Sequence, residues 1–486
     1  MPHASVNGVR LYYEECSRSS RSSFVPRLGA VSERELLRRT AEIAADFVET
    51  LDERSIWPPA TVEELREALG GPLPDDPSDP LDVIEALAAG AERGVVGIPS
   101  GRYFGFVIGG ALPAALAADW LTSAWDQNAG LVICGPSAAV CEDVAGEWLK
   151  DLLGLPETAS FAFVTGCQMA HVTCLAAARH DVLERVGWDV EAKGLAGSPP
   201  IAVVAGDRKH VTVDRALRLL GLGSEGTRRV DVDAQGRMQS DSLEGVLHDL
   251  TGPAIVCVQA GEVNTGSFDP IGEVAKLCRA AGAWLHVDGA FGLWAAASPE
   301  LRHLVAGVEH ADSWATDAHK WLNVPYDSGL AFVAHADAHR AAMRLGAEYL
   351  VANEGARDQM DWTPEFSRRA RGFAVYAALR TLGRSGVADL VERSCARARQ
   401  FATTMAKVAG CEILNDVVLN QVLFRFDDDA TTTALLASVQ ASGEAWMSGT
   451  TWDGRAAIRL SVSNWRTSET DVERTVAAFE AALIAA

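Results

Sequence analysis

Basic residues are the minority charge in this chain of 486 residues. Lys and Arg number 43 against 65 Asp and Glu, which gives a formal net charge of −22. A surface of this sign repels both the phosphate backbone of nucleic acids and the headgroups of anionic membranes. We therefore expect neither nucleic acid nor a membrane among the partners of this protein.

Long apolar runs and paired cysteines are also missing. No uninterrupted apolar stretch reaches the roughly 18 residues that a membrane-spanning helix needs, and the nearest, Phe104–Ala118, ends at Asp119 and is expected to be buried core. Met1–Arg10 lacks the basic and then apolar pattern of a secretory signal. The nine cysteines form no C-x-x-C pair and no His/Cys spacing suggests a metal site. We expect reduced cysteines, no metal and a cytoplasmic location.

Short β-rich runs alternate with helical stretches in the middle third of the chain. Gly, Pro or Asp bounds each run, and most intervening segments are long enough for crossover helices. This pattern favours the α/β class, with a mostly parallel central sheet and helices on both faces, in which ligands bind at the C-terminal ends of the strands. The predicted strands are Phe161–Val164, Ile201–Val204, Ile255–Val258, Trp284–Val287 and Leu330–Ala334.

Changes in composition divide the chain into four parts. Residues 1–31 are an appendage, with a predicted Asn-Gly hairpin in Val6–Glu15 and a polar linker. Residues 32–100 form a helical segment that begins after Ser32. Residues 101–375 form the large α/β domain. Residues 376–486 form a smaller α+β domain, in which we expect two helices (Ala374–Arg384, Val387–Ala409), two strands (Gln421–Phe426, Ala456–Ser463) and a final helix from Glu469.

Two charged residues stand close to predicted strand ends. Asp288 closes the strand Trp284–Val287, where a buried carboxylate needs a cation or a hydrogen-bond donor to offset the cost of desolvation. Lys320 lies in the mostly apolar TDAHKW stretch. A desolvated lysine can lose its proton near neutral pH and become a nucleophile toward carbonyl groups.

Two further features complete a set. The small-residue turn Thr165–His171 leads into a helix, whose free backbone N–H groups suit a phosphate. His210 follows the strand Ile201–Val204 and can stack on an aromatic ligand. A phosphate cradle, a stacking imidazole, a carboxylate for a ring nitrogen and an amine nucleophile are together what a pyridoxal phosphate (PLP) site requires.

Over roughly residues 55–480 the sequence resembles the group II PLP-dependent decarboxylases of fold type I, which include aromatic amino acid, glutamate and tyrosine decarboxylases. The most specific signal is HVDGA followed about thirty residues later by HKW. Other matching stretches are RYFGF (Arg102–Phe106), TGCQMAHVTCLAAAR (Thr165–Arg179), FDPI (Phe268–Ile271) and SVSNWRT (Ser461–Thr467).

The resemblance implies a homodimer, with the active site at the subunit interface, that decarboxylates an L-amino acid. Lys320 would form a Schiff base with PLP, Asp288 would hold the proton of the ring nitrogen, and His210 would stack on the ring. His319 would lie beside the lysine near the substrate carboxylate, which makes these four the expected catalytic residues. The other expected cofactor contacts are Ala290 against the ring, Gly166, Cys167 and Gln168 at the phosphate, and Asp317 near it.

Three positions depart from the family pattern. Cys167 and Gln168 stand where small or hydroxylated residues are usual, and Glu262-Val263 replaces a common Thr-Thr pair, for which Asn264 is a weak substitute. The mobile loop that carries a proton-donating tyrosine in well-known relatives contains no tyrosine in Leu350–Ser367. The candidates for returning the proton are therefore Tyr103, Tyr326, Tyr349, His319 or water.

These departures leave alternatives open. Without the loop tyrosine the enzyme can be an aldehyde-forming oxidative deaminase, and an aminotransferase is a second rival. A rival of another class is a catalytically silent dimeric homologue that serves as a scaffold. The sequence does not identify the substrate; candidate contacts are Trp125 as a pocket wall, and Arg459 or the group Arg368, Arg369 and Arg371 for a carboxylate.

Overall fold

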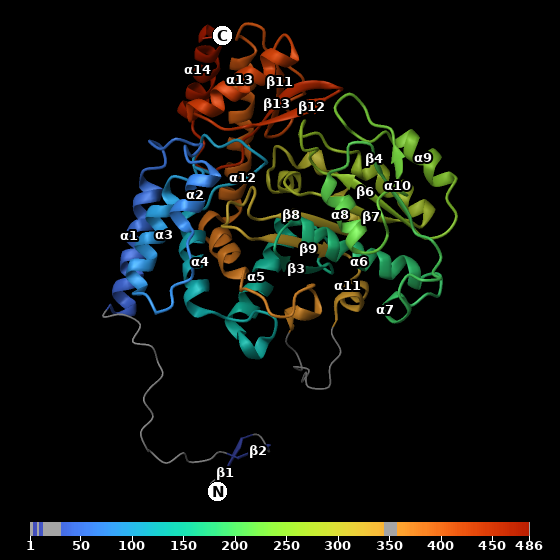
Figure 1. The fold of residues 1–486 in the computed structure, drawn as a ribbon. Helices are drawn as coiled ribbons and strands as arrows, with labels where there is room; N and C mark the ends of the chain where they lie inside the picture. The colour runs from blue at the N-terminus through green and yellow to red at the C-terminus, as the bar shows by residue number, and fades with distance from the viewer. Residues whose placement is uncertain (1–2, 7–8, 13–30, 345–356, 486) are drawn as a thin grey trace. The chain divides into compact units, whose positions relative to one another are not determined.

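The computed structural model describes residues 3–6, 9–12, 31–344 and 357–485, and the chain divides into two compact units (Figure 1). The first unit, residues 1–50 and 58–95, contains strands β1 (His3–Val6) and β2 (Val9–Tyr12) and helices α1 (Glu33–Glu49), α2 (Val62–Leu69) and α3 (Pro80–Glu92). The predicted hairpin is confirmed, because β1 and β2 pair antiparallel. Helix α1 begins where predicted, and the Ser32 side chain accepts a hydrogen bond from the Glu35 amide. The predicted linker lies outside the described residues.

The second unit, residues 51–57 and 96–486, is built on a seven-stranded sheet in the order β3-β9-β8-β7-β6-β4-β5. Only β9 runs antiparallel to its neighbours in this sheet, which confirms a mostly parallel α/β fold. The sequence pattern does not predict β5 or β8. The strands are β3 (Ser160–Val164), β4 (Ala202–Gly206), β5 (Arg228–Val230), β6 (Ala254–Gln259), β7 (Trp284–Asp288), β8 (Ser313–Asp317) and β9 (Gly329–Val333).

Helices cover both faces of this sheet. The α-helices of the large domain are α4 (Pro113–Trp125), α5 (Pro136–Leu152), α6 (Cys167–Glu184), α7 (Val190–Lys193), α8 (Val211–Leu219), α9 (Ser240–His248), α10 (Ile271–Ala281) and α11 (Ala336–Met343). Short 3-10 helices are η1 (Val132–Cys134), η2 (Gly292–Ala297), η3 (Arg302–Val305), η4 (Val308–His310) and η5 (Gln359–Asp361).

Alternation of side chains along each strand divides the core in two. On β7, Leu285 and Val287 join the core cluster that includes residues of α5, α9, α10 and α12, whereas Trp284 joins the cluster formed with α6 and α8. Successive side chains of a strand point to opposite faces. His286 and Asp288 therefore share the face of Trp284 and point toward α6.

A second, four-stranded antiparallel sheet lies near the C-terminus. Its order is β10-β11-β13-β12, from β10 (Glu412–Ile413), β11 (Gln421–Arg425), β12 (Ser448–Trp452) and β13 (Arg455–Ser461), with helices α13 (Asp429–Ser442) and α14 (Glu469–Ala485). The two predicted helices before it are one element, α12 (Gly372–Met405), interrupted at Gly383, whose φ of 60° is not helical. Among the described residues, no helix is both long and apolar enough to cross a membrane.

Candidate active site

Four strands and two helices bring the predicted site residues to one edge of the large sheet. Strands β3, β4, β7 and β8 run in the same direction, so their C-terminal ends lie at the same edge. Cys167 opens α6 just after β3, and His210 caps α8 after β4. Asp288 ends β7 and Asp317 ends β8. The unpredicted strand β8 therefore places Asp317 and, three residues later, Lys320.

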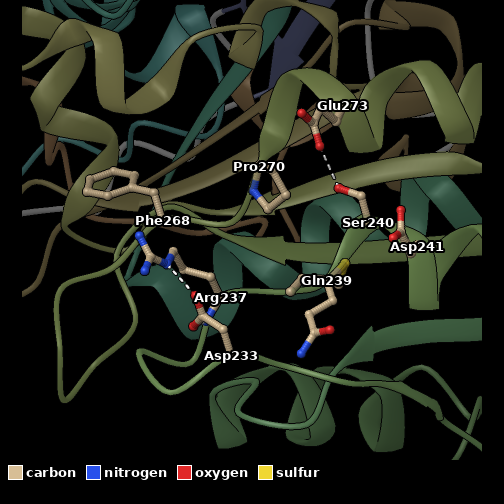
Figure 2. Close-up of a pocket in the computed structure, with 9 residues that line it drawn as sticks. Asp233, Arg237, Gln239, Ser240, Asp241, Phe268, Pro270 and Glu273 are labelled. Carbon is tan, nitrogen blue, oxygen red and sulfur yellow. Dashed lines mark hydrogen bonds and ion pairs between the residues drawn. The ribbon is translucent and has the colours of Figure 1, made fainter.

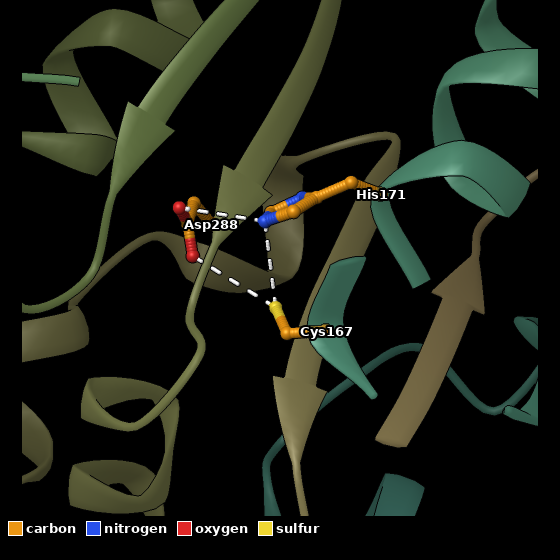
Figure 3. Close-up of side chains that lie close together, drawn as sticks. All are labelled: Cys167, His171 and Asp288. Carbon is orange, nitrogen blue, oxygen red and sulfur yellow. Dashed lines mark hydrogen bonds and ion pairs between the residues drawn. The ribbon is translucent and has the colours of Figure 1, made fainter. Parts of the chain in front are cut away.

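Asp288 is a buried carboxylate with several weak partners rather than one strong one. Its Oδ1 accepts a hydrogen bond from the Ala290 amide at 3.2 Å and lies 4.0 Å from the Cys167 sulfur, while Oδ2 lies 3.5 Å from Nε2 of His171 (Figure 3). Burial alone raises the pKa of Asp288, but His171, His210 and Lys320 together bring it below its ordinary value. Asp288 is therefore ionised at neutral pH.

Lys320 forms an ion pair with Asp317 that contradicts the expected fall in the pKa of the lysine. Its Nζ lies 2.9 Å from Oδ2 of Asp317, and the lysine side chain is 19% exposed. Burial alone lowers the pKa of Lys320, but the adjacent Asp317, with smaller contributions from Cys167 and Asp288, raises it above the ordinary lysine value. The expectation of a readily deprotonated lysine is wrong for this arrangement, because a carboxylate in contact outweighs desolvation.

Asp317 also occupies the predicted phosphate cradle. Its Oδ1 accepts a hydrogen bond of 2.6 Å from the backbone amide of Cys167, the first residue of α6. Gly166 leaves little room beside it, since a Cβ on this glycine would lie 3.2 Å from the His319 ring. Gln168 donates from Nε2 to the Thr212 carbonyl, and its Oε1 is buried without a partner among the described residues. The cradle thus exists, with a protein carboxylate in contact with it.

His210 is held as a neutral ring. The Thr212 amide donates to Nδ1 of His210, and the Thr212 hydroxyl lies 2.8 Å from the same nitrogen. Burial lowers the pKa of His210, and Lys320 and His171 lower it further, whereas Asp288 raises it. Nδ1 accepts, so the ring proton is on Nε2.

His319 stacks on Tyr326, with the ring centroids 4.2 Å apart and the planes 26° from parallel. The Ser328 amide donates to Nδ1 of His319, and Nε2 lies 3.4 Å from Oδ1 of Asp317. Burial lowers the pKa of His319 despite this neighbour, so the ring is neutral and its Nε2–H faces the carboxylate. Tyr326 is half exposed, whereas Tyr103 is buried and Tyr349 lies outside the described residues.

Aromatic residues gather beside this cluster. Trp446 stacks on Tyr103 and on Trp57, with ring centroids 5.2 and 5.7 Å apart, and contacts Phe106 at 5.2 Å. The same chain segment then passes against the lysine, since a Cβ on Gly109 would lie 1.8 Å from the carbonyl oxygen of Lys320. The segment that follows the RYFGF stretch therefore packs against the backbone of Lys320.

Other candidates have structural partners. Arg368 forms a buried ion pair with Glu142 at 2.8 Å, and Trp125 packs edge-on against Phe373. Asn264 is bonded to Glu262 and to Thr450, so it serves its own loop. Arg369 and Arg371 pair with Asp119 and Asp327.

Arg459 remains open as a candidate ligand. Its Nη1 donates a long hydrogen bond of 3.4 Å to the Val263 carbonyl, and its Nε is buried without a partner among the described residues. Its charge is near enough to lower the pKa of His210. A substrate carboxylate beside His210 would give this guanidinium a partner.

Sequence reasoning missed His171. It contacts Asp288 and, through its other nitrogen, His286 at 2.8 Å. Its position four residues after Cys167 on a helix was the available signal, because residues i and i+4 share a helix face.

A surface pocket of about 360 Å³ lies elsewhere (Figure 2). Acidic and polar side chains and one arginine line most of it, including Asp233, Arg237 and Glu273, and none of the predicted site residues does. It is not the place where the predicted chemistry is assembled.

The chain matches the family model for the pyridoxal-dependent decarboxylase conserved domain over residues 63–427. It is 27% identical over 458 residues to an aromatic-L-amino-acid decarboxylase of Bacillus atrophaeus, covering 91% of this chain and 93% of that protein. It is 26% identical over 463 residues to a phenylacetaldehyde synthase of Arabidopsis thaliana, covering 89% of this chain and 92% of that protein.

Solved structures share the fold. The chain superposes on a TDC of Oryza sativa, crystallised with PLP and tryptamine, with a TM-score of 0.87 at 24% identity over 94% of this chain and 98% of that chain. Mouse CSAD gives a TM-score of 0.86 at 21% identity, over 92% and 98% of the two chains. The fold and the family match together define a PLP-dependent enzyme. The chain belongs to the pyridoxal-dependent decarboxylase family, and its activity is the PLP-dependent decarboxylation of an L-amino acid.

Proposed function

We propose that the cluster around Asp288 and Lys320 holds PLP, with Lys320 bonded to the cofactor aldehyde carbon and Asp288 paired with the ring nitrogen. His210 covers one ring face, Ala290 packs against the ring, and His319 lies on the substrate side. When bound, PLP supplies an electron sink for the electrons released with carbon dioxide. Asp288 favours that role because an ionised carboxylate stabilises the proton on the ring nitrogen.

One observation carries this proposal: Asp288 and Lys320 belong to a single connected group. The Cys167 sulfur lies 4.0 Å from Asp288, its amide donates to Asp317, and Asp317 pairs with Lys320. The ionised Asp288 also raises the pKa of Lys320. These contacts link the acid and the amine in one cluster, which supports a ring held at both ends.

The phosphate end requires Asp317 to release the Cys167 amide. Two anions cannot share one N–H donor at the start of α6 without a large repulsion. Asp317 retains two other partners, Lys320 and His319. We infer that Gly166, Cys167 and Gln168 would hold the phosphate once Asp317 is held by Lys320 and His319 alone.

We further infer that the substrate has an aromatic side chain. The rings of Tyr103 and Phe106 pack on Trp446 just before Gly109, which contacts the backbone of Lys320, and Phe106 is 54% exposed. Arg459 is the proposed partner of the substrate carboxylate. Relatives named for aromatic substrates, including a tyrosine decarboxylase of Arabidopsis thaliana and a tryptophan decarboxylase of Oryza sativa, support this inference.

For the product we propose an amine, with Tyr326 and His319 returning the proton to the substrate carbon. His319 precedes Lys320 in the sequence and lies 3.4 Å from Asp317, and its ring stacks on Tyr326. The aldehyde-forming reaction is the second candidate, since similar chains include a phenylacetaldehyde synthase. The described part of the mobile-loop segment, residues 357–367, contains no tyrosine.

We propose a homodimer that works in the cytoplasm. Large apolar side chains on α4, η1 and α5 are exposed, namely Trp120, Leu121, Trp125, Ile133 and Val140, and a second copy would bury them. The eight cysteines in the described part of the chain are free thiols, which supports a reducing compartment.

Carbon dioxide release from each common L-amino acid tests the proposed function, with Lys320→Ala as the comparison. We expect release from aromatic amino acids and loss of at least 1,000-fold in Lys320→Ala, on the order of effects known for covalent catalytic residues. Turnover of acidic amino acids only would contradict the substrate inference. An unchanged rate in Lys320→Ala would contradict the proposed site.

A further inference from the structure

A buried chain of polar side chains leads from Asp288 away from the cofactor side of the site. His171 on α6 contacts Asp288 through Nε2, and its Nδ1 lies 2.8 Å from Nε2 of His286 on β7 (Figure 3). Nδ1 of His286 lies 2.9 Å from Oγ of Ser313 on β8, and that oxygen accepts a hydrogen bond of 2.9 Å from Nε1 of Trp284. The four residues beyond Asp288 are completely buried.

Asp288 sets the direction at its end of the chain, because an ionised carboxylate only accepts and Nε2 of His171 must therefore donate to it. At the other end the Ser313 oxygen accepts from Trp284, and its own hydrogen can be donated to His286. Burial, reinforced by His171, lowers the pKa of His286 to about 3, so this ring is neutral. With Nδ1 accepting from Ser313, the ring carries its proton on Nε2 and donates to the next histidine.

The same reasoning fixes His171. Its Nδ1 accepts from His286, so its ring proton is on Nε2, the nitrogen that faces Asp288. With its proton on Nδ1, the His171 ring would point a lone pair at the carboxylate and set two N–H groups against each other between the rings. The chain therefore presents an N–H donor to Asp288.

We propose that His171 is a positioning residue for this decarboxylase: it holds the Asp288 carboxylate toward the ring nitrogen of PLP, and the chain His286–Ser313–Trp284 fixes the tautomer in which it does so. The proposal rests on the proposed role of Asp288. The Nε2–H group of His171 orients the carboxylate through its contact with Oδ2 of Asp288. Asp288 keeps the negative charge that holds a proton on the ring nitrogen.

A metal ion is the rival interpretation of the same side chains. Donor atoms of Cys167, His171 and Asp288 lie within 4.8 Å of one another. Burial raises the pKa of the Cys167 thiol well above its ordinary value, with Asp317 and Asp288 adding to the shift, so this sulfur is protonated and is a poor metal ligand.

The first test is the tautomer of His171 in the full-length native chain. Two-bond 1H–15N correlation spectra of 15N-histidine-labelled protein distinguish Nε2–H from Nδ1–H rings, with the signals assigned through His171→Gln and His286→Gln. We expect Nε2–H for both residues and a changed His171 signature in His286→Leu. An Nδ1–H ring at His171 in the native chain would overturn the proposal.

The second test is PLP binding. It is measured by the quenching of protein fluorescence as PLP is added to the PLP-free chain. We expect His171→Leu to bind PLP roughly tenfold more weakly or worse, the loss expected for a hydrogen bond to a charged group. His171→Gln, whose amide nitrogen can replace Nε2–H, should recover most of the affinity. kcat should fall in His171→Leu with KM little changed, because the contact is to the cofactor side.

His339→Gln is the matched control. His339 is equally buried and hydrogen-bonded, to Ser160 and the Trp362 carbonyl, but it lies on α11. The His339→Gln variant should have native PLP affinity and native kcat. The proposal would be overturned if His171→Leu and His339→Gln lost PLP affinity equally, or if His171→Leu kept native PLP affinity. It would also be overturned if the native protein held a stoichiometric metal that His171→Leu lacks. Failure of the proposed function would give a different result: the native protein itself would form no PLP adduct on Lys320.

Discussion

Tyr326 is the residue whose removal distinguishes the two products. If its hydroxyl returns the proton after decarboxylation, Tyr326→Phe will divert part of the flux to reaction with dioxygen, which gives an aldehyde, ammonia and hydrogen peroxide. Burial raises the pKa of Tyr326 to about 12, so the phenol retains its proton at neutral pH. We expect the ratio of amine to aldehyde to fall at least tenfold, measured by chromatography with a peroxide assay.

Tyr103→Phe is the control for this prediction, since Tyr103 stacks on Trp446 and is buried. An unchanged ratio in Tyr326→Phe would assign the proton to His319, to water or to a residue of the loop. A native enzyme that already forms aldehyde and peroxide in equal amounts would show the second candidate reaction.

Two buried histidines make stability depend on pH. Burial is the main cause that lowers the pKa of His286 and of His339 to about 3. The unfolded chain takes up these protons below about pH 6.5, whereas the folded chain does not. The contribution of these two neutral histidines to the free energy of unfolding is therefore present above pH 6.5 and is lost as the pH falls toward 3.

Between pH 6.5 and 5.0 each of these histidines should remove about 2 kcal/mol from the free energy of unfolding. His339→Gln should make the loss over this interval smaller by that amount, as measured by urea unfolding at fixed protein concentration. An identical pH dependence in the variant and the native chain would contradict neutral burial of His339.

Strand β9 supports the start of α6 through a contact between two glycines. A Cβ on Gly329 would lie 2.4 Å from the Cα of Gly166, so Gly329→Ala must displace the backbone that opens the phosphate cradle. We expect a loss of about 1–3 kcal/mol in stability and weaker PLP binding, measured by thermal unfolding and fluorescence titration.

Gly245→Ala on α9 is the matched change, since nothing lies within 4 Å of an added Cβ there. Alanine at this helical position should stabilise the protein slightly. Native PLP affinity in Gly329→Ala would show that the cradle does not depend on the β3–β9 contact.

The sequence predicted the buried strands of the large sheet well because they are short, apolar and bounded by Gly, Pro or Asp. It did not predict β8, whose residues Ser313, Thr316 and Asp317 are polar although all are buried. These side chains are satisfied by partners far along the chain, such as Trp284 for Ser313 and Cys167 for Asp317. Such pairs depend on the sheet order, which local patterns do not contain.

The same limit applies to the site. Asp288, Lys320 and His210 stand out locally, at strand ends or in a specific motif, and the structure brings them to one edge. The ion pair of Lys320 with Asp317 and the contact of His171 with Asp288 appear only after folding. Consequently the sequence indicated which residues to consider but predicted the wrong direction for the pKa of Lys320.

The exposed apolar surface on α4, η1 and α5 bears on the assembly of the whole protein. Ile133 is 78% exposed, and Val140 and Trp125 are also largely exposed. If this surface joins two copies, Ile133→Glu will bury a charge in the interface and dissociate the dimer at micromolar concentration. Light scattering coupled to size-exclusion chromatography measures the mass directly.

Ile484→Glu is the control, because Ile484 is 89% exposed near the end of α14. We expect a dimer for this variant and a monomer for Ile133→Glu. A native chain that elutes as a monomer, or an Ile133→Glu variant that remains a dimer, would place the interface elsewhere or remove it.

A crystal structure of the PLP-loaded protein is the most direct measurement of the site as a whole. It should show continuous electron density from the nitrogen of residue 320 into the cofactor, with the ring nitrogen hydrogen-bonded to the carboxylate of residue 288 and the imidazole of residue 210 over the ring. Density for PLP bonded to a different lysine, or a ring nitrogen directed away from residue 288, would contradict the account.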